Sequence, residues 1–387
     1  MRLLHTADWH LGNSLFNHDR TDELFNQVER VCQIAEQNHV EVLLVAGDVF
    51  EGRSRLPEIT KRLANALSPY VRSGMHVILI PGNHDDREHF RMMHALLAIE
   101  QGQIERVHIV QTRMLISIAG VQFGVIPYPI SELLAPYNSN DIGAAQRHQN
   151  LSSAYAELVK AVVNEFDPAM PAVFVSHINV AGVKTSSGRE STYFEDIRLG
   201  TRDLPDAPNL AYIALGHIHQ RQKIDHVVPC YYSGSIDRMN FGEREDGKFV
   251  LLVDIPPNGP ASVTEVPLVP TPFYEIHLSS SELNTLNDRF SDLERAYFKI
   301  YLECEPGDDP VVLQRQIRKS FPRCIDLQLS RENLPSLTAD LPERPKDYTT
   351  TALDYLRQAY IKESDFIELE KRAKDLICEV SDADTTN

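Results

Sequence analysis

The sequence predicts an α/β protein in which helices alternate with the strands of a largely parallel sheet. Apolar residues recur at helical spacing in residues 21–38, and residues 40–46 form an almost continuous apolar run, as expected of a strand buried on both faces. Five apolar runs also end in a short polar cluster. Because the carboxyl ends of parallel strands meet at one edge of a sheet, these clusters are expected to converge there.

The elements of the first 255 residues follow from this alternation of patterns. The predicted helices cover residues 21–38, 59–70, 89–99 and 151–166. The predicted strands cover residues 2–8, 40–46, 76–80, 107–110, 114–118, 121–127, 172–176 and 210–215, with hairpin-like strands at 231–233 and 249–255.

Prolines crowd residues 255–260 and 267–272. Since proline interrupts both helices and central strands, a domain boundary is expected near residue 270. Beyond it, the patterns predict a small α+β module and then a helical tail. The module has strands at 274–278, 296–302 and 324–329 and helices at 281–291 and 310–320, and the tail has helices at 348–359 and 364–380 after a linker at 341–345.

The composition is that of an ordinary globular protein. The chain has 387 residues, of which 42% are hydrophobic, so it can hold one large domain and smaller modules. A net charge of −17 argues against nonspecific coating of nucleic acid, but DNA remains a candidate substrate, because bound cations would add positive charge locally.

The intracellular environment is predicted from features that the sequence lacks. The five cysteines are scattered and show no thiolate zinc spacing, which suits a reducing compartment. The first residues enter a strand without the pattern of a signal peptide, and no apolar run approaches the roughly 20 residues needed to cross a bilayer. We therefore expect a cytoplasmic protein that does not associate with membranes.

Five polar clusters carry the functional prediction: Asp8-x-His10, Gly47-Asp48, Gly82-Asn83-His84-Asp85, Ser176-His177 and Gly216-His217-x-His219. Alternating side chains in an extended segment place the first and third residues of an x-spaced pair on one side, so each such pair can clamp an ion. Oxygen and imidazole ligands without thiolate favour manganese, iron or zinc over calcium.

A second cation would require a ligand shared between the two ions, because neighbouring cations repel unless an anion lies between them. Asp48 is the best candidate for that ligand, while Asn83 offers an amide oxygen and His177 a further imidazole. Taken singly, a Gly-Asp after a strand is often only a turn, and an isolated histidine is usually a satisfied polar group. The argument for a metal centre is the recurrence of such residues at five strand ends.

Four segments resemble the motifs of calcineurin-like metallophosphoesterases, in the branch of DNA repair exonucleases that work with an SMC-like ATPase. They are Thr6-Ala7-Asp8-Trp9-His10-Leu11-Gly12, Gly47-Asp48-Val49-Phe50, Gly82-Asn83-His84-Asp85 and Gly216-His217-Ile218-His219. The resemblance in motifs spans residues 1 to about 240. It implies a metallophosphoesterase β-sandwich flanked by helices. It further implies a nuclease domain at 1–268, a small α+β capping domain at 273–337 and a C-terminal helical segment at 346–380 that binds the ATPase.

The same resemblance implies roles for individual residues. One ion would be held by Asp8, His10, Asp48 and His219, and the other by Asp48, Asn83, His177 and His217. The usual metal of the family is manganese. His84 would lie beside the ions without binding them, as the general acid for the leaving 3′ oxygen, and Asp85 would orient its ring. Residue 51 departs from the pattern: this chain has Glu51 where some relatives have His or Asp, and we assign it no ligand role.

The implied activity is 3′ to 5′ exonuclease action on double-stranded DNA and endonuclease action on single strands or hairpins, in a heterotetramer of two nuclease and two ATPase subunits. Basic residues near the clusters are candidate DNA contacts, although each is equally well explained as a solvated charge: Arg53, Arg55, Arg87, Arg91, Lys184 and Arg189. Two alternatives stay open, a small-molecule phosphodiesterase or phosphatase of the same fold and a non-catalytic scaffold. The two tail helices could also pack on their own chain.

Overall fold

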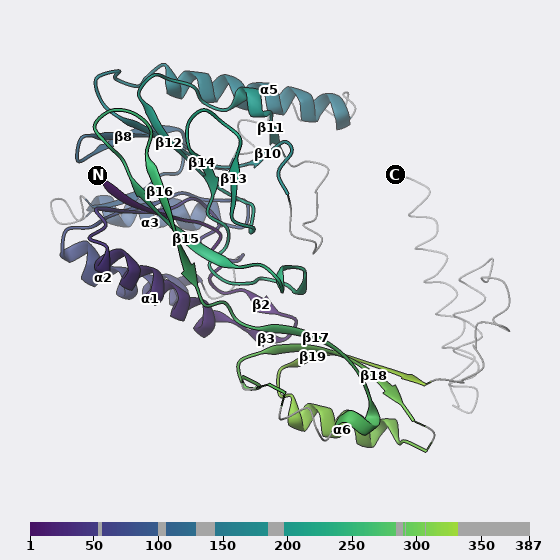
Figure 1. The fold of residues 1–387 in the computed structure, drawn as a ribbon. Coiled ribbons are helices and arrows are strands. Elements are labelled where there is room, and N and C mark those ends of the chain that lie inside the picture. The colour runs from purple at the N-terminus through teal and green to yellow at the C-terminus, as the bar shows by residue number, and fades with distance from the viewer. Residues whose placement is uncertain are drawn as a thin grey trace, which may run out of the picture.

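The computed structural model describes residues 1–52, 56–99, 106–128, 144–184, 197–283, 289–290, 292–305 and 307–331. Two six-stranded sheets form its centre (Figure 1). The first sheet has the order β16 (Ser262–Leu268), β15 (Lys248–Asp254), β1 (Arg2–Thr6), β4 (Val42–Val45), β5 (His76–Leu79) and β6 (Val107–Ile109). The second has the order β13 (Gln222–Ile224), β14 (Cys230–Tyr232), β12 (Leu210–Gly216), β9 (Ala172–His177), β8 (Val121–Ile126) and β7 (Met114–Ile118).

The sheets are packed face to face between two layers of helices (Figure 1). Helices α1 (Thr21–Gln37), α2 (Leu56–Arg72) and α3 (Arg87–Ile99) cover the outer face of the first sheet, and α5 (Ala144–Val163) covers that of the second. The prediction of an α/β fold with a β-sandwich flanked by helices is confirmed. Among the described residues, no helix is long and apolar enough to span a membrane.

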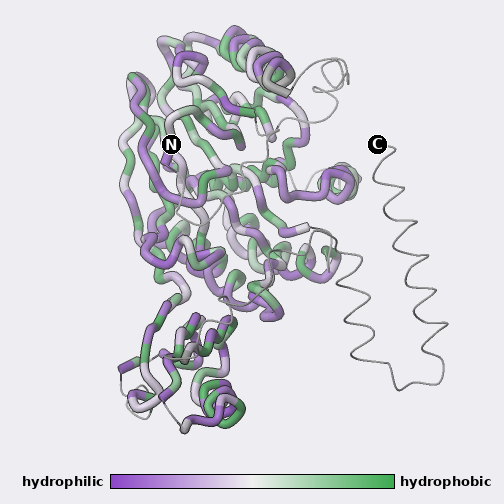
Figure 2. Tube along the Cα trace, turned by 90° about the vertical axis from the view of Figure 1, so that its right-hand side faces the viewer, coloured by the Kyte–Doolittle hydropathy of each residue, from purple (hydrophilic) through white to green (hydrophobic). Residues whose placement is uncertain are grey.

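Burial on both faces explains the continuous apolar runs of the central strands. In β4, Val42 and Leu44 point into the core between the sheets, whereas Leu43 and Val45 pack against the helices. The hydropathy view shows the same division, with largely apolar inner strands and helices that alternate between apolar and polar residues (Figure 2). Strands β1, β4, β5 and β6 are mutually parallel, as are β8, β9, β12 and β14. Their carboxyl ends can therefore meet at one side of the sandwich.

Two predictions for residues 231–268 were wrong. The strands at 231–233 and 249–255 do not form a hairpin, because β14 lies in the second sheet and β15 in the first. The proline-rich stretch does not interrupt the sheet as expected, since β16 pairs with β15 over seven residues. Pro267 is tolerated there because β16 is the edge strand, where a missing N–H disrupts no ladder on the outer side.

A smaller three-stranded sheet follows, formed by β17 (Phe273–Ser279), β18 (Tyr297–Cys304) and β19 (Cys324–Arg331). All three strands are parallel, and α6 (Pro310–Ser320) packs on one face with a core of its own (Figure 1). Of the predicted helix 281–291, residues 284–288 and 291 lie outside the described residues, as do residue 306 and residues 332–387 with the predicted segment 346–380.

A buried ion-pair network joins this smaller unit to the sandwich. Arg20 is fully buried, and its guanidinium donates to Glu23 at 2.9 Å and to Asp237 at 3.1 Å. The same group lies over the rings of Phe273 and Tyr297, at 5.4 and 5.6 Å from their centroids. Because a buried charge is costly unless it is paired, this network favours one arrangement of the two units.

Candidate metal centre

The five predicted clusters converge at the carboxyl ends of five strands. Strands β1, β4 and β5 of the first sheet are followed by Asp8 and His10, by Asp48, and by Asn83 to Asp85, respectively. In the second sheet, β9 ends at His177, and β12 is followed by His217 and His219. Residues more than 200 positions apart in the chain are thereby brought within hydrogen-bonding distance.

Asp8, His10 and His219 form the first group. Each offers one ligand atom, and these atoms lie within 4.8 Å of one another. The Nε2 atoms of His10 and His219 are 3.1 Å apart on rings inclined at 68°. Two imidazole nitrogens directed at one point, beside a carboxylate, match the donor set of a divalent transition metal.

Asp48, Asn83, His177 and His217 form the second group. The Asn83 Oδ1 atom lies 3.0 Å from His177 Nε2 and 2.9 Å from His217 Nδ1. Asp48 Oδ2 is 3.3 Å from His177 Nε2 and 3.8 Å from His10 Nε2, so this oxygen lies between the two groups. The geometry is the one that a shared carboxylate requires, and all seven predicted ligands are brought together.

The floor of the site is buried and highly polar. Asp8, His10, Asp48 and His177 are at most 2% exposed, whereas Asn83 and His84 lie at the opening. Burial alone would raise the pKa of Asp48, but the imidazoles of His177 and His10 outweigh it and hold that pKa well below its usual range. Burial likewise lowers the pKa of His177, and Asp48 overcomes this to raise it to about 9. Without a cation, the acids of the site therefore depend on protonated imidazoles.

Backbone strain is concentrated at the same residues. Asp8, His10, Asp48 and His217 have φ values of 53°, 46°, 50° and 100°, in the left-handed region that residues other than glycine rarely adopt. Such strain persists only where the surrounding structure enforces it, and it is typical of functional sites. It turns four predicted ligands out of the direction of their strands.

Two glycines of the motifs are required by close packing around the ligands. A Cβ atom on Gly82 would lie 2.0 Å from Asp48 Oδ1, and one on Gly47 would lie 2.0 Å from His177 Nδ1. Both distances are far shorter than any real contact. The Gly-Asp and Gly-Asn-His-Asp motifs therefore also record space that only glycine leaves.

Three histidines are oriented by an acceptor behind the ring. The Nδ1 atom of His177 lies 2.8 Å from Ala46 O, that of His219 lies 2.9 Å from Glu243 Oε1, and that of His10 lies 2.6 Å from Glu51 Oε2. With Nδ1–H donated to these acceptors, each Nε2 keeps its lone pair for a metal, the usual outer-shell arrangement.

The acceptor behind His219 belongs to a buried network. Glu243 also accepts from Lys248 Nζ at 2.5 Å, and the same ammonium donates to Ser235 Oγ at 2.8 Å. Both members of this ion pair are 1% exposed. Burial opposes the protonation of His219, but Glu243 overcomes it and raises the pKa of this imidazole to about 9. Sequence reasoning missed Glu243 and Lys248, because neither lies in a motif.

The role predicted for Asp85 is wrong in one respect. Its carboxylate accepts backbone N–H groups of Gly82, Val49 and Phe50 at 2.8, 3.1 and 2.7 Å, so it fixes the two loops to each other. In the described part of the chain it makes no hydrogen bond to the His84 ring. Burial and the charge of Asp48 raise the pKa of Asp85 to about 7.

The partner of His84 is instead Glu51. Its Oε1 atom lies 3.0 Å from His84 Nδ1, while its other oxygen contacts His10. That hydrogen bond is the main reason why the pKa of His84 is raised. The signal was visible in the sequence as an acidic residue three positions after Asp48, but without coordinates nothing showed which ring it would meet.

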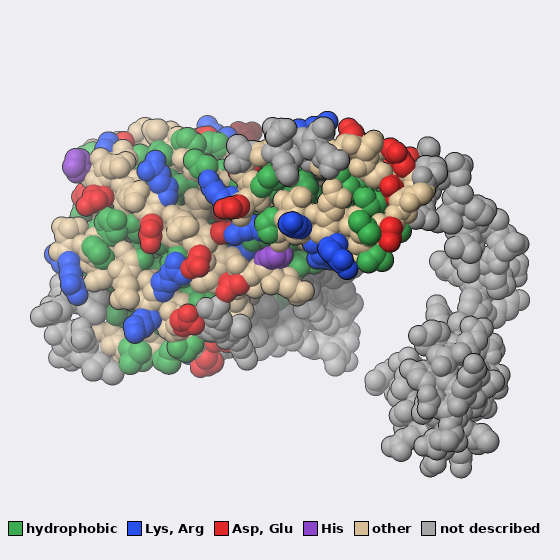
Figure 3. All heavy atoms as spheres, turned by 90° about the horizontal axis from the view of Figure 1, so that it is seen from below, with side chains coloured by type: hydrophobic (Ala, Val, Ile, Leu, Met, Phe, Trp, Pro, Cys, Tyr) green, Lys and Arg blue, Asp and Glu red, His purple; other side chains and the backbone are tan. Residues whose placement is uncertain are grey.

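The predicted DNA contacts are only partly described. Arg87 donates to the carbonyls of Gln111 and Tyr128, and Arg91 pairs with Glu88. Lys184 is exposed, and its backbone bonds to Gln222. Arg53, Arg55 and Arg189 lie outside the described residues. The face shown in Figure 3 carries Lys, Arg, Asp and Glu side chains intermixed, without a patch of one sign.

A two-sheet sandwich that gathers Asp, Asn and His from five strand ends defines a metal-dependent phosphoesterase. The chain belongs to the calcineurin-like phosphoesterase family, whose sequence model matches residues 1–221.

Among curated proteins, the chain is 28% identical over 269 residues to the SbcD subunit of the nuclease SbcCD of Escherichia coli (strain K12), and the match covers 65% of this chain and 64% of that protein. It is 26% identical over 276 residues to the protein of the same name from Staphylococcus epidermidis, covering 70% of each. The match thus spans less than two thirds of the E. coli relative. A solved dimetal phosphatase from Danio rerio aligns with a TM-score of 0.40 and 10% identity, over 68% of this chain and 98% of that one.

Proposed function

We propose that this protein is a two-metal phosphodiesterase that cleaves DNA, the nuclease subunit of a complex with an SMC-like ATPase of the SbcC type. The observation that carries the proposal is the position of Asp48, whose carboxylate lies between a histidine of one group and a histidine of the other. The names of the curated relatives support DNA as the substrate and the SbcC-type ATPase as the partner.

The proposed ligands follow the two groups. Asp8, His10, Asp48 and His219 hold one ion, and Asp48, Asn83, His177 and His217 hold the other. Manganese suits this mixture of oxygen and imidazole donors. When bound, the divalent ions supply the positive charge that activates a water molecule and stabilises the negative charge developing on the phosphate.

His84 is the proposed general acid. Its side chain is 43% exposed at the opening of the site, and its Nδ1 is held by Glu51, which leaves Nε2 free to face a substrate. Water attacks the phosphorus, the bond from phosphorus to the 3′ oxygen breaks, and His84 gives its proton to that oxygen. The ring stands edge-on to His10, with centroids 4.8 Å apart, so the donor is adjacent to the ions without being a ligand.

His84→Ala tests this role. The variant should still bind two Mn²⁺ ions, while the rate of DNA cleavage falls by about 10² to 10⁴, the usual contribution of a general acid. Ion content is measured by equilibrium dialysis and cleavage by release of nucleotides from labelled duplex DNA. Two bound ions together with the full nuclease rate would refute the role.

The substrate class is tested by competition between chemistries. Purified protein with Mn²⁺ is given plasmid DNA, a DNA hairpin and a chromogenic phosphate monoester. The proposal expects 3′ to 5′ degradation of duplex DNA and cleavage of the hairpin, with little turnover of the monoester. Preferential turnover of the monoester would favour a small-molecule phosphatase, and a protein that binds metal but cleaves nothing would favour a scaffold.

The partner is proposed from the relatives and from the helical patterns in residues 346–380. A heterotetramer would contain a homodimer of this chain and two ATPase subunits. Deleting residues 346–387 should abolish capture of the ATPase in a pull-down, yet leave the Mn²⁺ content unchanged, because every proposed ligand lies before residue 220. Capture that survives the deletion would remove this assignment. A cytoplasmic location likewise remains a prediction.

A further inference from the structure

Glu51 occupies an unusual position beside the metal centre. It follows the bridge between Leu11 and Phe50, and its backbone N–H donates to Leu11 O at 3.0 Å. The residue is therefore fixed to the loop that carries His10. Its side chain is 30% exposed, so the carboxylate lies at the boundary between the buried floor and the opening of the site.

The two oxygens of this carboxylate contact different rings. Oε2 lies 2.6 Å from Nδ1 of His10, and Oε1 lies 3.0 Å from Nδ1 of His84. The two rings are nearly perpendicular, with an interplanar angle of 82°. A planar carboxylate that meets one ring with each oxygen fixes the orientation of both rings relative to each other.

The two contacts have different consequences. At His10, an acceptor for Nδ1–H directs Nε2, with its lone pair, toward the point that it shares with Nε2 of His219. At His84, the same kind of contact leaves Nε2–H as the proton that can be given away. One side chain therefore serves the metal and the proton donor together.

No other described carboxylate does this. Glu243 contacts His219 alone among the rings and is buried against Lys248, and Asp85 accepts only backbone amides. Glu51 itself has no Lys or Arg partner within the described ranges, where its ion pairs are those with His10 and His84.

We propose that Glu51 is a positioning residue that orients the metal ligand His10 and the proton donor His84 with a single carboxylate. The part concerning His84 rests on the proposed phosphodiesterase function. The part concerning His10 requires only that the site binds a metal.

The test compares leaving groups in Glu51→Gln, which keeps the size of the side chain but offers only one acceptor oxygen. Duplex DNA expels a 3′ alkoxide, which needs a proton, whereas the p-nitrophenyl ester of thymidine 5′-monophosphate expels p-nitrophenolate, which does not. We expect the rate on DNA to fall at least about 10-fold more than the rate on the ester, a part of the 10² to 10⁴ that a general acid contributes.

The second readout is independent of activity. Mn²⁺ affinity, measured by isothermal titration calorimetry, should be about 10- to 100-fold weaker in Glu51→Gln, as is typical when an outer-shell partner of a metal-binding histidine is removed. Glu157→Gln removes a surface carboxylate that is 72% exposed and should change neither measurement.

A double variant separates the two roles. In a His84→Ala background, Glu51→Gln should still weaken Mn²⁺ binding, but it should no longer change the ratio of the two rates. Glu51→Asp retains the charge and should restore part of the Mn²⁺ affinity.

Equal losses on both substrates with unchanged Mn²⁺ affinity would overturn the proposal, since they would indicate a merely structural residue. Wild-type protein that binds Mn²⁺ but cleaves neither substrate would refute the proposed function and the role at His84, and the Mn²⁺ affinity of Glu51→Gln would still decide the role at His10.

Discussion

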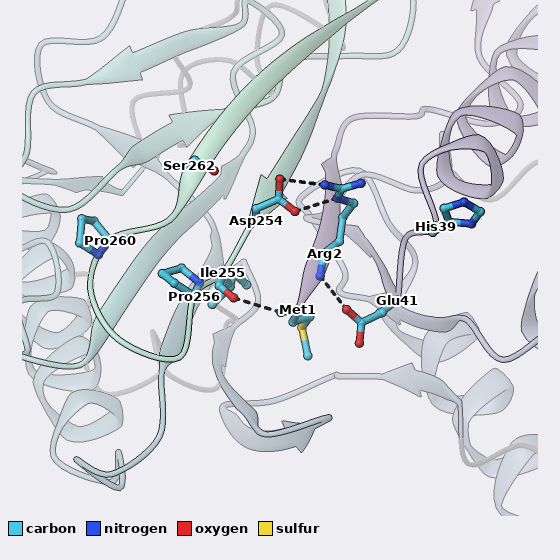
Figure 4. Close-up of a pocket in the computed structure, with 9 residues that line it drawn as sticks. All are labelled: Met1, Arg2, His39, Glu41, Asp254, Ile255, Pro256, Pro260 and Ser262. Carbon is cyan, nitrogen blue, oxygen red and sulfur yellow. Dashed lines mark hydrogen bonds and ion pairs between the residues drawn. The ribbon is translucent and has the colours of Figure 1, made fainter.

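The two ends of the same strands carry polar clusters of opposite character. At the amino ends of β1 and β4, a cavity of about 540 Å³ is lined by charged and polar groups (Figure 4). The Arg2 guanidinium pairs with Asp254 at 2.7 Å, the Arg2 backbone N–H donates to Glu41 at 2.8 Å, and the Met1 amino group donates to Ile255 O at 3.0 Å. Donors and acceptors at this end satisfy one another.

At the carboxyl ends, acceptors face acceptors. Asp8 and Asp48 share a buried space with imidazole nitrogens that lie within 4.8 Å of their oxygens, on a backbone strained at four residues. Such a cluster is stable only with protons or cations between its members. The comparison teaches that a cluster of charged residues indicates a binding site when its members lack complementary partners, and that mere abundance of charge does not.

The largest effect is expected from Asp48→Asn, which would make the carboxyl ends more like the amino ends. Loss of the shared carboxylate should reduce bound Mn²⁺ from two ions to at most one. DNA cleavage should fall about 10³-fold or more, because losing several kcal/mol of charge stabilisation corresponds to that factor. Metal analysis and cleavage assays check this, with circular dichroism to confirm folding. Two ions and an unchanged rate would contradict the comparison.

The next effect concerns packing behind the ligands. In Gly82→Ala, the new methyl group would meet Asp48 Oδ1, so we expect weaker Mn²⁺ binding and a loss of about 1 to 3 kcal/mol in the free energy of unfolding, as for other overpacked sites. Gly259→Ala is the control. No atom lies within 4 Å of its Cβ, so it adds only backbone strain at φ 88° and should leave Mn²⁺ binding unchanged. Equal Mn²⁺ affinities in the two variants would refute the packing argument.

The third effect is a pH dependence confined to the carboxyl ends. In metal-free protein, Asp48 and Glu243 overcome burial and raise the pKa values of His177 and His219 to about 9, above the ordinary 6.5. Such groups stabilise the fold fully below pH 6.5, and this contribution is lost as the pH rises through about 9. Each imidazole contributes up to about 3 kcal/mol, from 1.36 kcal/mol per pKa unit.

The melting temperature of metal-free protein should therefore fall between pH 6.5 and 9, while the increase caused by Mn²⁺ grows over the same range, because ions then bind without displacing protons. Differential scanning fluorimetry with and without Mn²⁺ measures both. A melting temperature that stays constant over this range in the absence of metal would show that the histidines are already neutral.

The smallest effect is expected at the amino ends. Arg2→Met removes the pair with Asp254, whose side chains are 41% and 49% exposed, so solvent already screens the interaction. We expect a slight loss of stability that disappears in 1 M salt, with Mn²⁺ binding and cleavage unchanged. Chemical denaturation at low and high salt is the measurement, and altered Mn²⁺ binding would show that the two ends are coupled.

Much of the fold followed from local patterns. Helix α6 spans the predicted residues 310–320, and β7 spans the predicted residues 114–118, because amphipathic periodicity and apolar runs are encoded locally. The failures involve pairing. Nothing local to residues 231–233 indicates which sheet they join, and the edge position that lets Pro267 lie in β16 exists only once the sheet is assembled.

The candidate site divides in the same way. The seven ligands were predictable because each lies in a short motif directly after a strand. The partners behind them were not, since Glu243 reaches His219 from outside any motif, and Asp85 and Glu51 exchange their expected relation to His84.

The sequence by itself determined the sandwich of two sheets, the five strand ends and the donor atoms that they carry, because these depend on residue type and spacing along the chain. Only the tertiary structure decided which carboxylate meets which imidazole, where the backbone is strained, and which polar cluster is satisfied without a cation. Those properties depend on distances of a few ångströms between segments up to about 200 residues apart, which no local pattern specifies.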